Sequence, residues 1–400
     1  MKFRNILPAA AAVILTLSCC TNGKTDENTD GLTVGAARVS EYTDALKGRK
    51  VALFSNQTGM VGDEHVLDLL LKEGVDVVTI FSPEHGFRGE ADAGESVDSG
   101  TDEKTGVKIT SLYGSGFDYE DSANFEGIDV IVSYIQDVGL RFYTYYVTMV
   151  KLMESAARFD KSFVVLDRPN PNGMYVDGPI LDMKYRSGVG RLPIPVVHGL
   201  TLGEMALMAN GEGWLDDGLK VKDLKVVKCE GYTHQTRYTL PVAPSPNLKS
   251  MHAIYLYPSL CYFEATPVSL GRGTDSPFEI YGHPDFKAEG EDLYSFTPVS
   301  MPGAKEPPQM GNLCYGRDLR GIPDEEIISK GLDLSYLIDA YNHIENHEGF
   351  FRDFFELLIG RGDIRTMIEE GRSAEEIKAT WAQDVADFKV LRRKYLLYEE

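Results

Sequence analysis

Three polar segments of the sequence bring carboxylates, arginines and other hydrogen-bonding side chains together at close spacing. They are residues 82–89 (SPEHGFRG), 136–145 (QDVGLRFYTY) and 167–173 (DRPNPNG). Each segment follows a run of β-branched and other apolar residues, which is the pattern of a buried strand. Ligands of open α/β sheets bind beyond the carboxyl ends of parallel strands, so we expect the three segments to converge at one edge of a sheet. Acids, guanidinium groups and an imidazole gathered there would make an active site.

The strands that would position these segments alternate with amphipathic helices. The sequence predicts strands at 51–54, 75–81, 108–112, 128–134 and 162–167, with helices at 66–72 and 147–158. Continuous Val and Ile runs separated by helices favour a parallel sheet that is covered on both faces. We therefore predict the α/β class, with a Rossmann-like sheet over roughly the first 230 residues. The first strand is not followed by a glycine-rich phosphate loop, which argues against a nucleotide-dependent enzyme.

The second half of the chain has a different pattern. Residues 241–258 are rich in Pro, Ser and Asn and indicate a domain boundary, and residues 289–311 have the composition of a loop. We place the two domains at 33–240 and 241–400, a division that suits a chain of 400 residues. Beyond residue 323 the periodicity predicts mainly helices, at 324–330, 334–342, 349–358 and from 374 onward.

Charge and composition exclude several classes of protein. Hydrophobic residues make up 43% of the chain and charged residues 25%, as in ordinary globular proteins, so disorder is excluded. The 61 acidic residues exceed the 40 Lys and Arg residues, for a formal charge of −21. Such a surface repels nucleic-acid phosphates and anionic membranes, and we expect neither as the principal ligand. An anionic substrate would need a local group of arginines.

The N-terminus has the composition of a secretory signal. Two basic residues precede an apolar run over residues 6–17, and Cys19 and Cys20 follow it. A positive start, a short apolar run and small residues before a cysteine resemble a bacterial lipoprotein signal. We expect removal of residues 1–18, a lipid on Cys19 (with Cys20 as the alternative) and a flexible tether over residues 19–32. A plain secretory signal with incidental cysteines is the other interpretation.

The remaining cysteines and the histidines do not form a pattern that requires a metal. Cys229, Cys261 and Cys314 lack the spacing of a zinc site, and we expect them to be buried apolar side chains. His343 and His347 lie four residues apart on an expected helix, a spacing that could bind a metal but also arises by chance. We therefore expect no metal and no cofactor.

A fourth segment, residues 263–279 (FEATPVSLGRGTDSPFE), completes a set of motifs. In this order the four segments resemble the DUF1343 family, whose characterised members are exo-β-N-acetylmuramidases of the NamZ type. The resemblance extends over nearly all of the chain after the tether. It implies a Rossmann-like domain, a smaller α+β C-terminal domain and an active-site cleft between them. It also implies a glycoside hydrolase that removes terminal N-acetylmuramic acid (MurNAc) from the non-reducing end of peptidoglycan fragments such as MurNAc-GlcNAc.

Two carboxylates are the candidates for catalysis under this resemblance. Glycoside cleavage needs a protonated acid at the leaving oxygen and a group that meets the developing positive charge, often a second carboxylate. Glu84 is the leading catalytic residue, and partial burial would raise its pKa toward that of a general acid. Alternatively, Glu84 forms an ion pair with Arg88 that only stabilises the loop. Asp137 is the second carboxylate or an orienting group, or else the N-cap of the following helix.

The lactyl carboxylate of MurNAc needs a cation in so acidic a protein. Arginine can hold a carboxylate through two hydrogen bonds, and Arg88, Arg141 and Arg272 are the candidates. Glu264 would face the cleft if both domains enclose it, or else it pairs with Arg272.

Other residues of the motifs are candidates for substrate binding. Tyr143 either donates a hydrogen bond to the substrate or packs, and Asp167 and Arg168 position the substrate or their own loop. His198 either lines the cleft or is a buried structural histidine. The remaining candidates are His85, Asn170 and Thr274.

The expected cellular location and the expected substrate agree, because an enzyme of the cell envelope would meet peptidoglycan fragments. We expect a lipoprotein of the periplasm, the outer membrane or the cell surface, attached to the membrane only through its lipid. The main alternative to an enzyme is a non-catalytic lipoprotein that binds muropeptides or other glycans in the same cleft.

Overall fold

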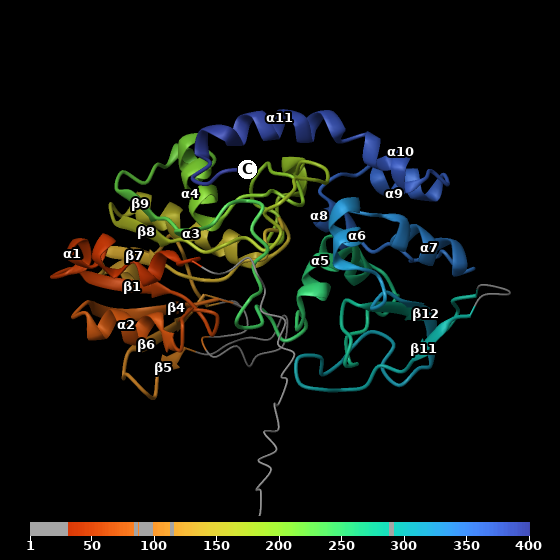
Figure 1. The fold of residues 1–400 in the computed structure, drawn as a ribbon, viewed down its shortest axis with the longest axis horizontal. Helices are drawn as coiled ribbons and strands as arrows, with labels where there is room; N and C mark the ends of the chain where they lie inside the picture. The colour runs from red at the N-terminus through yellow and green to blue at the C-terminus, as the bar shows by residue number, and fades with distance from the viewer. Residues whose placement is uncertain (1–30, 84–86, 88–98, 113–115, 288–291) are drawn as a thin grey trace, which may run out of the picture.

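The computed structural model describes residues 31–83, 87, 99–112, 116–287 and 292–400. The chain forms two parts that lie side by side, a large one built on a central sheet and a smaller one of helices with a short sheet (Figure 1). The predicted α/β fold with a smaller C-terminal part is confirmed. Within the described residues, none of the helices has the length and apolar character needed to span a bilayer.

Among the described residues, the central sheet has seven strands in the order β5-β6-β4-β1-β7-β8-β9. Their bounds are Lys50–Phe54 (β1), Asp76–Ser82 (β4), Gly100–Thr101 (β5), Lys108–Ser111 (β6), Val130–Ser133 (β7), Ser162–Leu166 (β8) and Leu224–Val227 (β9). All neighbouring strands are parallel except β5, which pairs antiparallel with β6 at one edge. The five predicted strands are therefore confirmed, and β5 and β9 extend the sheet at its two edges. A short hairpin of β2 (Met60–Val61) and β3 (Glu64–His65) precedes α2.

Helices cover both faces of this sheet. The helices of the large part are α1 (Thr43–Leu46), α2 (Val66–Lys72), α3 (Thr144–Arg158) and α4 (Leu202–Gly211). Successive residues of a strand point to opposite faces. Val51 and Leu53 of β1 accordingly belong to one apolar cluster with α1 and α2, and Ala52 and Phe54 belong to the other with α3 and α4. The sheet is therefore doubly wound, and both of its faces are buried.

The smaller part packs helices on a three-stranded antiparallel sheet in the order β10-β12-β11. Its elements are α5 (Met251–Leu260), β10 (Ile280–His283), β11 (Tyr294–Phe296), β12 (Cys314–Asp318), α6 (Asp324–Lys330), α7 (Ser335–His343), α8 (Phe354–Ile359), α9 (Ile364–Glu369) and α10 (Ala374–Ala379). The sequence predicts α6 with the bounds that the structure has. It gives no separate helix at α9, which a turn separates from α8.

One sequence prediction for the smaller part is wrong, and the segment predicted as a domain boundary contains a helix. The helix α5 begins within residues 241–258, where the sequence predicts the boundary, and it includes Pro258. The helix forms because residues 253–260 are all buried, which outweighs the N–H group that proline lacks. The predicted loop over 289–311 contains the strand β11, whose Phe296 packs in a small apolar cluster of the sheet.

The helix α11 (Ala382–Arg392) runs back from the smaller part to the large one (Figure 1). Just before this helix, Trp381 donates its Nε1–H to Asp177 of the large part at 2.9 Å. At its end, Arg392 donates to the carbonyl of Gly199. The helix is thus fixed at both ends to the large part, and it ties α9 and α10 to that part.

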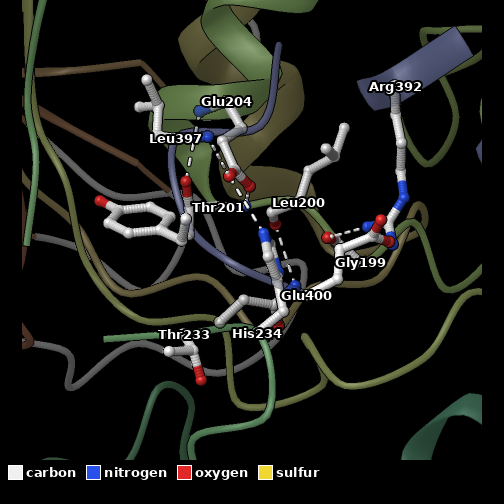
Figure 2. A network of polar contacts seen from close by, with 12 residues as sticks. Gly199, Leu200, Thr201, Glu204, Thr233, His234, Arg392, Leu397 and Glu400 are labelled. Carbon is white, nitrogen blue, oxygen red and sulfur yellow. Dashed lines mark hydrogen bonds and ion pairs between the residues drawn. The ribbon is translucent and has the colours of Figure 1, made fainter. Parts of the chain in front are cut away.

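Figure 2 shows how the segment after α11 closes on the first turn of α4. Glu204, which is fully buried, forms a capping box with Thr201 at the start of the helix. Its Oε1 accepts a hydrogen bond from the Leu397 N–H at 2.8 Å and lies 3.0 Å from His234 Nε2. One buried carboxylate therefore joins the helix start, a loop of the large part and the last segment.

Candidate active site

A cavity of about 780 Å³ is lined by residues of both parts of the molecule. Its walls include Phe142, Tyr143, Thr144, Tyr145, Asn247, Tyr257, Glu264, Arg272, Phe278, Pro307, Phe354 and Leu358. The first four come from the connection that follows β7 and begins α3, so the cavity lies at the carboxyl edge of the sheet, where strand ends are predicted to meet. Its volume lies in the range of cavities that bind small molecules.

Two tyrosines form the wall contributed by the large part. The hydroxyls of Tyr143 and Tyr145 both donate to the carbonyl of Pro244, at 2.9 and 3.0 Å. Asn56, which follows β1, donates its Nδ2–H to the Tyr145 hydroxyl at 2.8 Å. The carboxyl ends of β1 and β7 therefore meet at this wall, and the hydroxyl of Tyr143 is committed to the protein.

Asp137 lies behind this wall and is almost completely buried. Its Oδ1 accepts a hydrogen bond from the Gly139 N–H at 2.8 Å, whereas its Oδ2 has no hydrogen-bond partner among the described residues. Burial raises the pKa of Asp137 to about 7, although the backbone N–H groups of Gly139, Tyr146 and Val138 act in the opposite direction. Asp137 itself is not part of the cavity wall. The carboxyl group of Asp137 can therefore hold a proton near neutral pH. It lies close to the first turn of α3.

Glu264 and Arg272 lie on the cavity wall contributed by the smaller part, where they form an ion pair. Both of the alternatives for Glu264 therefore hold, because it pairs with Arg272 and faces the cavity. Burial alone would lower the pKa of Arg272, but the adjacent Glu264 carboxylate raises it, so the guanidinium stays charged.

Asp167 is fully buried and contacts other parts of the protein. Its carboxylate accepts hydrogen bonds from the Thr201 hydroxyl (2.6 Å), the Gly203 N–H (2.8 Å) and the Tyr398 hydroxyl (2.7 Å). Burial raises its pKa to about 6 against these donors. Of the two alternatives, these contacts describe the positioning of its own loop.

Arg168 is also directed into the protein. It donates to the Gln136 side chain at 2.8 Å and to the Thr58 carbonyl at 2.6 Å, and its guanidinium lies 4.8 Å from the centre of the Tyr134 ring. The strand ends after β1, β7 and β8 therefore converge as predicted. The buried side chain of Arg168 joins these strand ends to one another.

Arg141 corrects a sequence prediction. Its guanidinium is fully buried and donates four hydrogen bonds to the carbonyls of Pro179, Ile194, Leu358 and Ile359, over 2.6–3.1 Å. Burial lowers its pKa to about 10. We withdraw Arg141 from the candidates for the substrate carboxylate, because its donors hold the last carbonyls of α8 against the large part.

Three further candidates also have partners inside the protein. Asn170 donates to the Leu200 carbonyl at 2.9 Å and accepts from the Asn172 N–H. His198 is buried, which lowers its pKa to about 3, and its Nδ1 accepts from the Leu200 N–H at 3.1 Å. Thr274 donates to the Gly271 carbonyl at 2.6 Å and lines a separate hollow of about 380 Å³. None of the three lines the larger cavity, so the structure does not place them in contact with a substrate there.

Some candidates fall where the structure gives no description. Glu84, His85, Arg88 and Cys19 lie outside the described residues. Pro83, which precedes Glu84, directly follows the end of β4 at the carboxyl edge of the sheet and is buried.

No group of three or more His, Cys, Asp or Glu residues suited to a metal ion is found among the described residues. The helix α7 ends at His343, so His343 and His347 do not share a helical face. The His347 ring instead stacks on Tyr341 at 3.8 Å. Cys229, Cys261 and Cys314 are buried and free, as the sequence predicts.

Sequence reasoning missed four residues at or beside the cavity: Asn56, Tyr145, Asn247 and Tyr257. Asn56 follows a predicted strand, so the strand-end rule that identified the other segments contained the signal for it. Tyr145 lies in the segment 136–145, two residues beyond Tyr143. Asn247 and Tyr257 fall in the segment with the composition of a boundary, and nothing local marked them.

These features define a class: a two-part α/β protein with a ligand cavity at the carboxyl edge of a doubly wound sheet. The sequence profile of the exo-beta-N-acetylmuramidase NamZ N-terminal domain matches residues 51–252, and that of its C-terminal domain matches residues 255–398. The chain belongs to this family.

Relatives support the assignment over about nine-tenths of the chain. The peptidoglycan beta-N-acetylmuramidase NamZ of Bacillus subtilis is 37% identical over 373 residues, which cover 90% of this chain and 89% of that protein. Two crystal structures of DUF1343 family proteins from Bacteroides fragilis are also similar. One is 55% identical with a TM-score of 0.85 and the other 29% identical with a TM-score of 0.75, and each alignment covers 92% of this chain and 99% of the other.

Proposed function

We propose that the chain is an exo-β-N-acetylmuramidase, a glycoside hydrolase that removes terminal MurNAc from the non-reducing end of peptidoglycan fragments. One observation carries this conclusion: the Bacillus subtilis peptidoglycan beta-N-acetylmuramidase is 37% identical over 90% of the chain. The cavity supports it, because about 780 Å³ with aromatic walls suits a sugar. A binding protein without activity is not favoured, because the identity extends through both parts.

The experiment that tests this function uses two defined disaccharides. Purified protein is incubated with MurNAc-GlcNAc and, separately, with GlcNAc-MurNAc, and the released sugars are identified by mass spectrometry. We expect free MurNAc from the first and no cleavage of the second. Cleavage of GlcNAc-MurNAc, or of neither disaccharide, would contradict the proposal.

For the chemistry, we propose Glu84 as the proton donor to the leaving oxygen. The support comes from its motif and from its place in the chain, directly after the buried Pro83 that follows β4. Replacing Glu84 by Gln should leave binding of MurNAc intact and lower kcat by about 100-fold or more, the usual effect of losing a general acid. Unchanged turnover by Glu84→Gln would remove Glu84 from this role.

Asp137 acts as a positioning residue in this scheme. Its carboxyl group lies behind the cavity wall, and its Oδ1 is held by the backbone of Gly139. It influences the reaction through the connection that carries Tyr143 and begins α3. Asp137→Asn should therefore change kcat much less than Glu84→Gln does.

We also propose that the protein is a cell-envelope lipoprotein with its lipid on Cys19. The support is the sequence of the first 20 residues. In cells fed an alkyne-tagged fatty acid, the wild-type protein and Cys20→Ala should be labelled and Cys19→Ala should not. Label on Cys19→Ala that is lost in Cys20→Ala would move the lipid to Cys20, and no label on the wild type would leave a plain secretory signal.

A further inference from the structure

The cavity wall of the smaller part presents one arginine in a fixed arrangement. Arg272 lies between Gly271 and Gly273, whose φ angles are +81° and +80°, a backbone region that favours glycine. A Cβ atom on Gly273 would lie 2.5 Å from Pro307, another residue of the cavity wall. The turn that carries Arg272 is therefore packed tightly against the wall, and the start of the arginine side chain is fixed there.

An aromatic ring and a carboxylate fix the other end of the Arg272 side chain. The guanidinium carbon lies 5.4 Å from the centre of the Phe278 ring, and Nη2 donates to Glu264. Phe278 has a φ angle of +62°, which is rare for a bulky residue, and its N–H is held by the Leu270 carbonyl at 2.8 Å. Such strain persists only where the surrounding structure imposes it, and it occurs often at ligand sites.

Among the described charged residues of the cavity wall, the Arg272 guanidinium can still bind an anion. The described charged residues of the wall are Glu264, Arg272, Lys305 and Glu306, so their formal charges cancel. Lys305 and Glu306 are exposed, whereas only 20% of the Arg272 side chain and 24% of the Glu264 side chain are accessible. A guanidinium has five N–H donors, and Glu264 is the hydrogen-bond partner found for Arg272 among the described residues. A second carboxylate can therefore share this guanidinium with Glu264.

We propose that Arg272, oriented by Glu264 and Phe278, binds the lactyl carboxylate of MurNAc and thereby selects MurNAc over N-acetylglucosamine (GlcNAc). This inference rests on the proposed function, since that function supplies the sugar. The lactyl carboxylate is the charged group that MurNAc has and GlcNAc lacks. Bidentate arginine–carboxylate pairing in a partly desolvated cavity gives both strength and specificity.

The test uses three aryl β-glycosides: of MurNAc, of its lactyl carboxamide and of GlcNAc. The carboxamide has nearly the size of the acid but no charge, so it isolates the charge contact. Replacing Arg272 by Gln should lower kcat/KM for the MurNAc glycoside by about 10- to 150-fold, the usual cost of a lost hydrogen bond to a charged group. The values for the carboxamide and the GlcNAc glycoside should change by less than about threefold, because neither carries the charge that Arg272 binds. Arg272→Lys should fall between the wild type and Arg272→Gln for the MurNAc glycoside.

A matched pair elsewhere in the smaller part provides the control. Arg365 pairs with Glu356 and lies 5.6 Å from the centre of the Phe351 ring, with side-chain exposures of 26% and 17% for the two charged partners. This pair does not line the cavity. Arg365→Gln should therefore leave the preference for MurNAc over its carboxamide unchanged, whatever it does to thermal stability. Glu264→Gln should lower that preference, because it removes the carboxylate that orients Arg272.

Two results would overturn the assignment of Arg272. One is an equal loss of kcat/KM on all three glycosides in Arg272→Gln, and the other is an unchanged preference in that variant. If the wild type hydrolyses none of the glycosides, the proposed function fails, and calorimetric binding of free MurNAc and its carboxamide then decides for Arg272. Binding of MurNAc that Arg272→Gln abolishes would support the contact, whereas no binding to the wild type would remove it.

Discussion

Replacing Asp137 by Asn should remove a large part of the pH dependence of folding stability. The carboxyl group is buried, its Oδ2 has no hydrogen-bond partner among the described residues, and burial raises its pKa from 3.8 to about 7. Between these two pH values the unfolded chain has lost the proton and the folded chain still holds it. The folded state therefore binds more protons, and the free energy of unfolding falls as the pH rises through this range.

The magnitude follows from the size of the pKa shift. Each pKa unit corresponds to 1.36 kcal/mol, so a rise from 3.8 to about 7 costs about 4 kcal/mol of stability once the pH exceeds 7. Asn has no proton to lose, and its side-chain oxygen can still accept the Gly139 N–H. The stability of Asp137→Asn relative to the wild type should therefore rise by about 1.4 kcal/mol per pH unit from about pH 4 to pH 7 and then level off.

The assay is urea unfolding of both proteins at a series of pH values from about 4 to 8.5. Asp167, whose pKa is raised to about 6, contributes a similar slope in both proteins and cancels in the difference. Asp63 is exposed, so Asp63→Asn serves as the control and should follow the wild type at every pH. A constant difference between Asp137→Asn and the wild type across the series would refute the reasoning, since it would mean that Asp137 is ionised at the same pH in both states.

Three further outcomes follow from the structure. Arg141→Met should lower the free energy of unfolding by about 2–4 kcal/mol, because four buried carbonyls lose their donor; unchanged stability with a raised KM would return Arg141 to the substrate. Tyr143→Phe should cost about 1 kcal/mol of stability and change kcat/KM by less than about threefold, because its hydroxyl is committed to Pro244; a loss of activity well beyond that would mean that the hydroxyl turns to the substrate. Burial lowers the pKa of His198 to about 3, so ¹⁵N NMR spectra should show a neutral ring at pH 5. Because its ordinary pKa is 6.5, the unfolded chain binds a proton that the folded chain does not, and the free energy of unfolding falls as the pH drops from 6.5 toward 3. A protonated ring at pH 5 would contradict the burial of His198.

The large sheet could be predicted from the sequence because its strands are buried on both faces. A continuous apolar run such as that of β7 is typical of a strand buried on both faces. The bounds of α2 are those of its apolar periodicity, and Gly74 lies just beyond the helix with a φ angle of +78°. The edge strand β9 was missed because Lys225 interrupts a short half-buried run. The strands β10 and β12 of the smaller part were missed because they carry Gly282 and Gly316 in paired positions, where glycine weakens the strand pattern.

The sequence predicted the sheet edge at which the candidate site lies and named Tyr143, Glu264 and Arg272 of its wall, but it did not predict how most of the motif side chains are directed. Topology brings the strand ends together, whereas the direction of each side chain depends on partners far away in the sequence. Arg141 finds two of its four carbonyl partners more than 200 residues later, in α8, and Asp167 finds one partner at Tyr398. Pairing of Glu264 with Arg272 could be anticipated because both belong to one short motif, eight positions apart.

Two of the motif arginines, Arg141 and Arg168, support the cavity wall without lining the cavity. Arg141 fixes the end of α8, whose Leu358 belongs to the cavity wall, and Arg168 fixes the loop after β1 beside the β7 end. Substitutions at either position should therefore lower activity by displacing walls, even though neither guanidinium reaches the cavity. A loss of activity alone then cannot assign a motif residue to catalysis. The distinction lies in substrate selectivity: a displaced wall affects all sugars, whereas loss of the Arg272 contact should affect only those that carry the lactyl carboxylate.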